Sequence, residues 1–195
     1  KNLLFLNTIG KQAKNPSGVV NNVFIQGPFQ CFWRINTIFA TRISKHVANH
    51  RSKDVQLWRQ GNINLVTNYE PMSAAWYFAR EHGPSACGMG FRVKDASQAW
   101  ARLMEAGAEP VDTQTGPMEL SIPAIKGIGG ALIYIIDRYA DANGEGSADG
   151  LSIYDIDFEY LDGVEKFPEG AGFQRIDHLT HNVYGGRMAY WADWY

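Results

Sequence analysis

Ala86-Cys-Gly-Met-Gly-Phe-Arg-Val93, followed directly by Lys94-Asp-Ala-Ser-Gln-Ala-Trp-Ala-Arg-Leu-Met-Glu-Ala-Gly107, is the stretch that decides the fold. Its first eight residues are typical of a β-strand. Asp95 is a typical helix N-cap, and Gln98 lies three residues later, as a capping box requires. Apolar residues then recur at helical spacing until Gly107 ends the pattern. The stretch therefore predicts a strand followed by an amphipathic helix.

Three further strands are expected after this helix, at residues 109–113, 120–125 and 131–136, with a Gly-rich turn at residues 126–130. The order is βαβββ. The same order is repeated upstream, with a strand at 23–26, an apolar stretch at 32–39 in the helix position, and strands at 45–49, 55–59 and 62–67. A helix at 73–82 separates the two units. We predict an α+β fold of two βαβββ units, with mixed sheets and helices on the outside.

The remainder of the chain follows a different pattern. Residues 141–150 are polar and rich in Gly, which indicates a flexible loop and a domain boundary. Residues 154–160 are expected to cross over to a third unit, which opens with a strand at 175–184 and a helix at 187–195. The predicted organisation is a lead-in tail at 1–14, an N-terminal domain at 15–140, a loop and crossing linker at 141–170, and the start of a second domain at 171–195.

Composition excludes several classes of protein. The chain has 195 residues with a formal net charge of -2 and no basic stripe, so nucleic acid is not an expected partner. No apolar run approaches the roughly 18 residues of a membrane span. Cys31 and Cys87 match no paired metal or redox spacing, which favours a reduced, cytoplasmic protein.

Common catalytic motifs are absent from the sequence. It contains no Gly-x-Ser-x-Gly elbow, no Walker-type phosphate loop and no His-Glu-x-x-His helix. His178 and His181 are the best candidates for metal chemistry. Because a strand alternates its faces, two residues three apart point to opposite sides, and at most one of them can face a site. Metal centres need three or four ligands, so this pair alone is also consistent with a structural role.

Other residues of chemical interest are expected to be structural. The histidines lie at predicted element ends. The tryptophans are expected to anchor the core. Asp155 and Asp157 would share one strand face as solvated or paired carboxylates rather than as a general acid and base. These residues are His46, His50, His82, Trp58, Trp76, Trp100, Asp155 and Asp157.

Several long strings of the sequence resemble bacterial 4-hydroxyphenylpyruvate dioxygenases, some relatives of which carry haemolysin or legiolysin names. The strings are His50-Arg-Ser-Lys-Asp-Val55, Leu57-Trp-Arg-Gln-Gly-Asn-Ile-Asn-Leu65, Glu81-His-Gly-Pro-Ser-Ala-Cys-Gly-Met-Gly-Phe-Arg-Val-Lys-Asp95, Thr115-Gly-Pro-Met-Glu-Leu120, Pro123-Ala-Ile-Lys-Gly-Ile-Gly-Gly130, Ile153-Tyr-Asp-Ile-Asp-Phe158 and Ile176-Asp-His-Leu-Thr-His-Asn-Val-Tyr184. The resemblance covers residues 15–195 and is thin between residues 15 and 49.

This resemblance implies the vicinal-oxygen-chelate fold, which is built from βαβββ units. It also implies an Fe(II)-dependent enzyme of tyrosine catabolism that converts 4-hydroxyphenylpyruvate and O2 to homogentisate and CO2. The family's iron is held by two His and one Glu. By position, His178 matches one of these ligands and His181 does not. No catalytic residue and no further ligand of the family is matched in this sequence.

Three functions follow as expectations from this resemblance. The first is a 4-hydroxyphenylpyruvate dioxygenase-like protein that is inactive as this chain alone, because one ligand cannot hold iron. The second is a non-catalytic scaffold or oligomerisation module, since the family's N-terminal domain lacks the metal. The third is a hydroxymandelate synthase-like enzyme, which uses the same substrate and scaffold. Members of the family are usually oligomers, so a homo-oligomer is expected.

Overall fold

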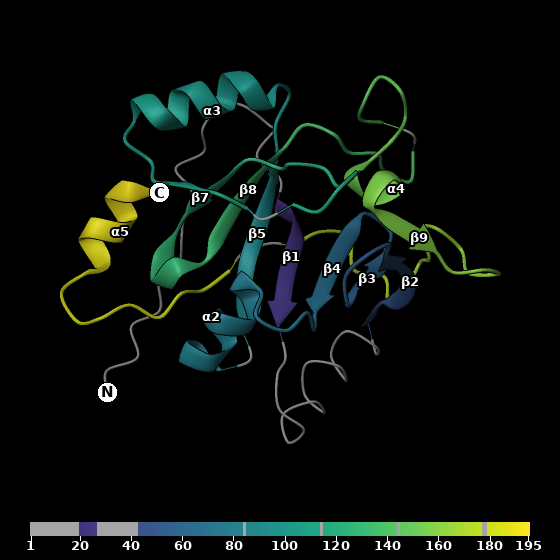
Figure 1. Cartoon of the computed structure of the whole chain (residues 1–195), viewed down its shortest axis with the longest axis horizontal. Helices are drawn as coiled ribbons and strands as arrows, with labels where there is room; N and C mark the ends of the chain where they lie inside the picture. Colours follow the sequence, from purple (N-terminus) through teal and green to yellow (C-terminus); the bar gives the residue numbers. More distant parts are fainter. Residues whose placement is uncertain (1–19, 27–42, 84, 114, 144, 177–178) are drawn as a thin grey trace.

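The computed structural model describes residues 20–26, 43–83, 85–113, 115–143, 145–176 and 179–195 (Figure 1). The strands found there are β1 (Val20–Gln26), β2 (Lys45–His50), β3 (Val55–Gln60), β4 (Ile63–Asn68), β5 (Ala86–Arg92), β6 (Pro110–Val111), β7 (Ala124–Lys126), β8 (Leu132–Ile136) and β9 (Phe158–Tyr160). The helices are α2 (Ala74–His82), α3 (Ala96–Glu105), the 3-10 turn η1 (Ile128–Gly130), α4 (Ile153–Asp157) and α5 (Met188–Trp194).

These strands form one sheet in the order β6-β7-β8-β5-β1-β4-β3-β2-β9. β1 pairs in parallel with β4, and β5 pairs in the same way with β8, while the antiparallel pair β1–β5 joins the two units. Each unit thus repeats the other's strand order. The predicted α+β fold of repeated βαβββ units is confirmed, and the apolar stretch expected at the helix position of the first unit lies outside the described residues.

The deciding stretch folds as predicted. β5 ends at Arg92, and the Asp95 carboxylate accepts a hydrogen bond from the Gln98 backbone N–H at 2.8 Å. Gly107 ends the helical turn with a left-handed φ of 83°. Helix α3 then packs its apolar side on Ile133 and Ile135 of β8. We call this side of the sheet the outer face.

The first unit contains the expected hairpin. β3 and β4 pair along their whole length, and Gly61 occupies the turn with φ 46°. Side chains alternate along this hairpin. Leu57 and Arg59 point to the face opposite the outer face, which we call the inner face, whereas Trp58 packs on the outer face.

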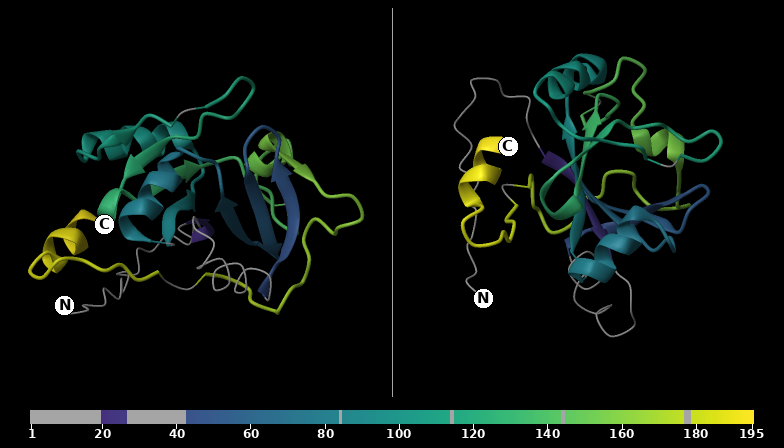
Figure 2. Two further views of the ribbon diagram at one scale, coloured as in Figure 1. Left: turned by 60° about the horizontal axis from the view of Figure 1, so that its bottom comes forward. Right: turned by 60° about the vertical axis from the view of Figure 1, so that its left-hand side comes forward.

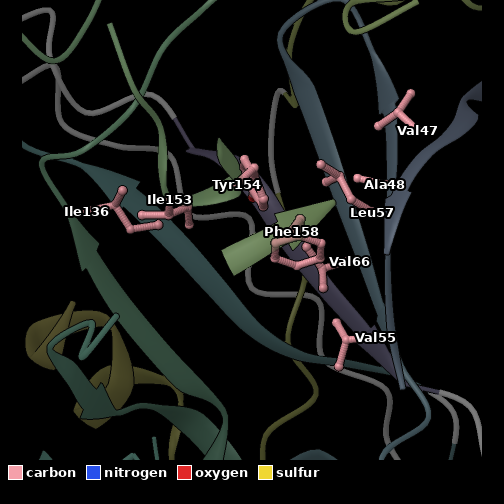
Figure 3. Packing of buried hydrophobic residues seen from close by; sticks show 9 residues of the cluster. All are labelled: Val47, Ala48, Val55, Leu57, Val66, Ile136, Ile153, Tyr154 and Phe158. Atoms are coloured by element: carbon pink, nitrogen blue, oxygen red, sulfur yellow. The ribbon is translucent and has the colours of Figure 1, made fainter. Parts of the chain in front are cut away.

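Residues 154–160, expected as a crossing segment, complete the sheet instead. β9 pairs with β2, and α4 and β9 together place Ile153, Tyr154 and Phe158 in the core of the inner face. Figure 3 shows these three side chains between Ile136 on one side and Leu57 on the other. The sequence did not predict this packing, because α4 is only five residues long, carries no helical repeat and follows a polar loop.

The prediction that Asp155 and Asp157 share a strand face is wrong, because both lie in α4. Asp155 closes a capping box with Ser152, and the side-chain amine of Lys166 donates to its carboxylate at 2.5 Å. Asp157 accepts from the backbone N–H of Leu120 at 3.1 Å. Both carboxylates are therefore paired, which agrees with the structural role expected for them.

The chain beyond β9 runs across the molecule to α5 on the opposite side (Figures 1 and 2). The predicted helix is present as α5, and none of its residues is buried. The strand predicted at 175–184 is wrong for the described part of that range, since residues 175–176 and 179–184 contain no strand. Within the described residues, no helix has the length and apolarity that a membrane crossing requires.

Candidate functional site

His178, the metal ligand implied by resemblance, lies outside the described residues. Asp177 next to it lies outside them too, and the nearest described residues are Ile176 and Leu179. Ile176 and Leu179 both pack on the outer face of the first unit, against Ile63 and Leu65. The segment around the predicted ligand is therefore bound to the outside of the sheet through apolar contacts.

His181 is described and has a structural environment. Its ring stacks on that of Tyr195, with 6.0 Å between the ring centroids, and burial lowers its pKa. The Tyr195 hydroxyl lies 3.5 Å from the backbone N–H of Ile128, which can donate to it. His181 thus helps to hold the end of the chain against the turn between β7 and β8. The orientation of His181 was predicted from a strand, but the described residues around it form no strand, and its ring is placed by the contact with Tyr195.

The described side chains do not fit an iron centre by themselves. No group of three or more His, Cys, Asp or Glu residues that could hold a metal ion occurs among them. The donor chemistry of the inner face is also adverse to a cation, because this face carries two guanidinium groups, those of Arg59 and Arg92.

Arg59 organises the polar centre of the inner face. It is only 1% exposed. Its Nε donates to the Asn64 side-chain carbonyl at 2.6 Å, and Nη1 donates to the backbone carbonyl of Lys166 at 3.0 Å and to the Tyr160 hydroxyl at 3.3 Å. The guanidinium also lies 4.7 Å from the ring centroid of Phe167. A planar, delocalised cation suits this combination of fixed donors and aromatic neighbours.

Tyr154 lies between this centre and Arg92. Its ring centroid is 5.2 Å from the Arg59 guanidinium, and burial raises the pKa of its phenol. Burial likewise lowers the pKa of Arg92, whose guanidinium covers the ring of Tyr139 at 4.9 Å. A phenol with a raised pKa is a poor general base near neutral pH. The inner face is thus a packed interior that fixes α4 and β9 to the sheet.

A second polar group surrounds Glu119. Its carboxylate accepts hydrogen bonds from the Lys53 amine at 2.6 Å, from the Ser52 hydroxyl and from the Gly116 backbone N–H. Burial alone would raise the pKa of Glu119, but these three donors lower it to about 2. His50 lies beside this group and is packed edge-on to Phe158. Burial lowers the pKa of His50 despite the nearby carboxylates of Glu119 and Asp157.

The other histidines and Cys87 have structural roles. The His46 ring stacks on Trp58 at 5.0 Å, and Nε2 of His82 lies 3.0 Å from the Gly129 carbonyl oxygen. Cys87 is buried, and burial raises the pKa of its thiol to about 12, which leaves it unreactive. Cys31 lies outside the described residues. Trp58 and Trp100 pack against core clusters, whereas Trp76 packs against Arg80 and Tyr77.

Sequence reasoning missed Arg59 and Glu119, the centres of the two polar groups. Arg59 shares the strand face of the apolar residues Val55 and Leu57, which is a detectable sign of a buried cation. Nothing in the sequence near Glu119 indicates its partners Ser52 and Lys53, which lie 66–67 positions away.

A hollow of about 390 Å³ lies apart from both groups, between the start of α3 and the strands next to it. It contains none of the residues that the sequence singled out for metal chemistry. Its lining residues are Ala96, Ser97, Trp100, Val111, Asp112, Thr113, Ser121, Ile122 and Pro123.

Comparison with known families gives a direct match. The family described as "Hydroxyphenylpyruvate dioxygenase, HPPD, N-terminal" matches residues 13–159. The chain is 57% identical over 182 residues to the 4-hydroxyphenylpyruvate dioxygenase of Pseudomonas sp. (strain P.J. 874), with 93% of this chain and 49% of that protein aligned. It is 46% identical over 164 residues to hemolysin VllY of Vibrio vulnificus (strain CMCP6), with 83% of this chain and 43% of that protein aligned.

A solved structure supports the same relationship. A xylose isomerase-like TIM barrel/4-hydroxyphenylpyruvate dioxygenase fusion protein superposes with a TM-score of 0.59 at 32% identity. The match covers 75% of this chain and 23% of the fusion protein. The chain spans about half the length of the curated relatives it matches, and the family match ends at residue 159, within β9.

Proposed function

Because this chain belongs to the hydroxyphenylpyruvate dioxygenase family, we propose that it supplies the N-terminal, supporting half of an enzyme that converts 4-hydroxyphenylpyruvate and O2 to homogentisate and CO2. The observation that carries this proposal is the 57% identity to a 4-hydroxyphenylpyruvate dioxygenase over 93% of the chain. The packed inner face supports the proposal that this half has a supporting role and not a catalytic one. Tyr154 and Phe158 occupy that face with the chain's own atoms, so the domain provides a rigid support.

The iron site of this reaction is proposed to use His178 as one ligand. The family's Fe(II) would bind the 2-oxo acid group and activate O2. The described residues contribute no further metal group, so we expect the other ligands to come from a different part of the enzyme. In this scheme the sheet domain holds the His178 segment through Ile176 and Leu179. We also propose a cytoplasmic location and assembly as a homo-oligomer.

A second candidate is a non-catalytic scaffold or oligomerisation module. The packed inner face favours it, because a sheet whose inner face is covered by Tyr154 and Phe158 can be stable without any cofactor. The two candidates differ in whether the chain takes part in iron binding.

The test has two stages, of which the first uses the purified chain alone. We expect far less than one iron per chain by plasma mass spectrometry and no O2 uptake on 4-hydroxyphenylpyruvate, because one His cannot hold the metal. Iron near one per chain with homogentisate formed would contradict the proposed division of labour.

In the second stage, the chain is co-expressed with the part of the Pseudomonas relative that it does not match. Dioxygenase function predicts that iron and turnover appear, and that His178→Ala lowers iron affinity by more than about 100-fold. Even changes to residues that only hydrogen-bond to a metal ligand lower metal affinity by about 10–100-fold. His181→Ala is the matched control and should keep iron binding. A complex that forms without iron or turnover would favour the scaffold.

A further inference from the structure

The chain leaves the sheet domain through a segment that is held closely against the β3–β4 hairpin. We call residues 166–173 the strap and residues 174–195 the arm. The backbone N–H of Gly61 donates to the Pro168 carbonyl at 2.7 Å, and the Pro168 side chain is fully buried. Arg59 binds the carbonyl of Lys166 at the start of the strap. The first part of the strap is thus attached to the end of β3 through Arg59 and to the β3–β4 turn through Gly61.

Gln60 holds the other end of the strap. This residue ends β3 and is 1% exposed. Its side-chain oxygen accepts hydrogen bonds from the backbone N–H groups of Ala171 at 3.1 Å and of Phe173 at 3.2 Å. One buried acceptor therefore fixes two alternate residues of the chain, and this fixes the direction as well as the position of the backbone.

Gly170 allows this approach to Gln60. It has a left-handed φ of 65°, and a Cβ at this position would lie 2.5 Å from the Gln60 Cβ and 2.7 Å from the Ile43 carbonyl oxygen. Any side chain at residue 170 would therefore push the strap away from the hairpin. Gly172 has a similar left-handed φ of 83°, but no atom lies within 4 Å of its Cβ position. The two glycines share a backbone conformation and differ in their surroundings.

The contacts become sparse directly after this point. Phe173 is 57% exposed, and the next two residues are exposed as well. Ile176 and Leu179 then rest on the outer face through apolar contacts, which do not define a direction. The arm is held again near its end, where the Tyr195 hydroxyl lies 3.5 Å from the Ile128 backbone N–H. The direction in which the arm leaves the domain is therefore set where the strap ends.

We propose that Gln60 and Gly170 form a clamp that sets the direction in which the arm leaves the domain, and that both are positioning residues for it. The clamp acts on backbone N–H groups, so its effect on the arm requires no metal. Since the arm carries His178, the clamp also orients the proposed iron ligand; this last step rests on the proposed function.

The experiment compares Gly170→Ala with Gly172→Ala in the full 195-residue chain by hydrogen–deuterium exchange. Both variants carry the strain of a left-handed alanine, but only Gly170→Ala breaks the clamp. We expect exchange of residues 171–183 to rise by about tenfold or more in Gly170→Ala, the factor given by 1.4 kcal/mol. In Gly172→Ala the rise should stay below about threefold, and β3 and β4 should exchange as in the parent chain in both variants.

Gln60→Met is the second clamp variant, because it removes the acceptor at similar volume; Gln56→Met, on the same strand, is its control. Gln60→Met should reproduce the rise in exchange of the arm. Equal behaviour of the two glycine variants, or an unchanged arm in Gln60→Met, would overturn the proposal. Unfolding of both clamp variants would overturn it too, because a positioning contact must be separable from the fold. The measurement uses no iron, so a failure of the dioxygenase test leaves its result standing.

Discussion

The strap and the arm are consecutive in the chain, yet they are held by different means. The strap makes directional hydrogen bonds to buried groups, with Arg59 at one end and Gln60 at the other. The arm packs on the outer face through apolar contacts, its helix α5 buries no residue, and its end is held by one long hydrogen bond from the Ile128 N–H to the Tyr195 hydroxyl. Directional contacts specify one geometry, whereas apolar contacts tolerate sliding.

This difference separates the support from the part proposed to carry chemistry. The sheet domain completes its own core with α4 and β9, and the polar groups around Arg59 and Glu119 are hydrogen-bonded within it. The arm presents exposed aromatic side chains, among them Tyr184 and Tyr190, and holds the implied ligand His178. We expect the arm to adopt its functional geometry on a further surface, starting from the direction that the strap gives it.

The largest effect should come from the core residue that ties α4 to the sheet. Tyr154 is 4% exposed and lies against Arg59. We expect Tyr154→Ala to lower the free energy of unfolding by about 3–5 kcal/mol, as for other large-to-small aromatic changes in cores. Urea denaturation followed by circular dichroism measures it.

Tyr190→Ala in the arm is the matched control, because Tyr190 is 51% exposed. Its effect should stay within about 0.5 kcal/mol. A small effect of Tyr154→Ala would mean that residues 154–160 are a crossing linker, as the sequence predicted. A large effect of Tyr190→Ala would remove the distinction between domain and arm.

The sequence predicted the second unit well because local signals there agree with one another. Asp95 and Gln98 define the start of α3, and Gly107 defines its end. It did not predict that Tyr154 and Phe158 complete the core, because burial of a five-residue helix depends on the distant strands β2, β3 and β8. The strand expected at 175–184 failed for a related reason, since a strand forms only where a neighbour supplies hydrogen bonds.

An intermediate effect on stability is expected from a change of Glu119, and this effect should depend on pH. Its folded pKa of about 2 lies below its ordinary value of 4.5, so it contributes stability that is present above pH 4.5 and is lost as the pH falls toward 2. Glu119→Gln should lower the free energy of unfolding by roughly 1–2 kcal/mol at pH 7. It should also flatten the loss of stability between pH 4.5 and 2.

Glu109→Gln is the control for this prediction, because Glu109 pairs with Lys126 at 3.0 Å on the exposed surface. The change there should stay within about 0.5 kcal/mol at pH 7. An acid profile of Glu119→Gln that matches that of the parent chain would show that the three donors around Glu119 do not stabilise its charged form.

The candidate site was predicted less completely than the fold, for physical reasons. His178 was identified through the resemblance, and the structure leaves that residue undescribed. Arg59, Gln60 and Glu119 act through partners that are distant in the sequence, as the separation of Gln60 from Ala171 by 111 positions illustrates. Pairings of this kind depend on the three-dimensional register, which local patterns do not encode.

The smallest effect is expected from the protonation of one histidine in each region. Burial lowers the pKa of both His50, in the domain, and His181, in the arm. A His with a lowered pKa contributes stability that is lost as the pH falls below its ordinary value of 6.5. His50→Gln should therefore reduce the fall in the urea midpoint between pH 7 and pH 5.

His181→Gln should leave that midpoint profile unchanged, because the arm can open and protonate His181 while the sheet stays folded. Its effect should be seen in hydrogen exchange of α5, which in the parent chain should become faster at pH 5 than the intrinsic pH dependence of exchange allows. If His181→Gln changed the urea profile as much as His50→Gln, the arm would unfold together with the sheet. The strap would then join two parts of one cooperative unit, and His178 would be held by the domain itself.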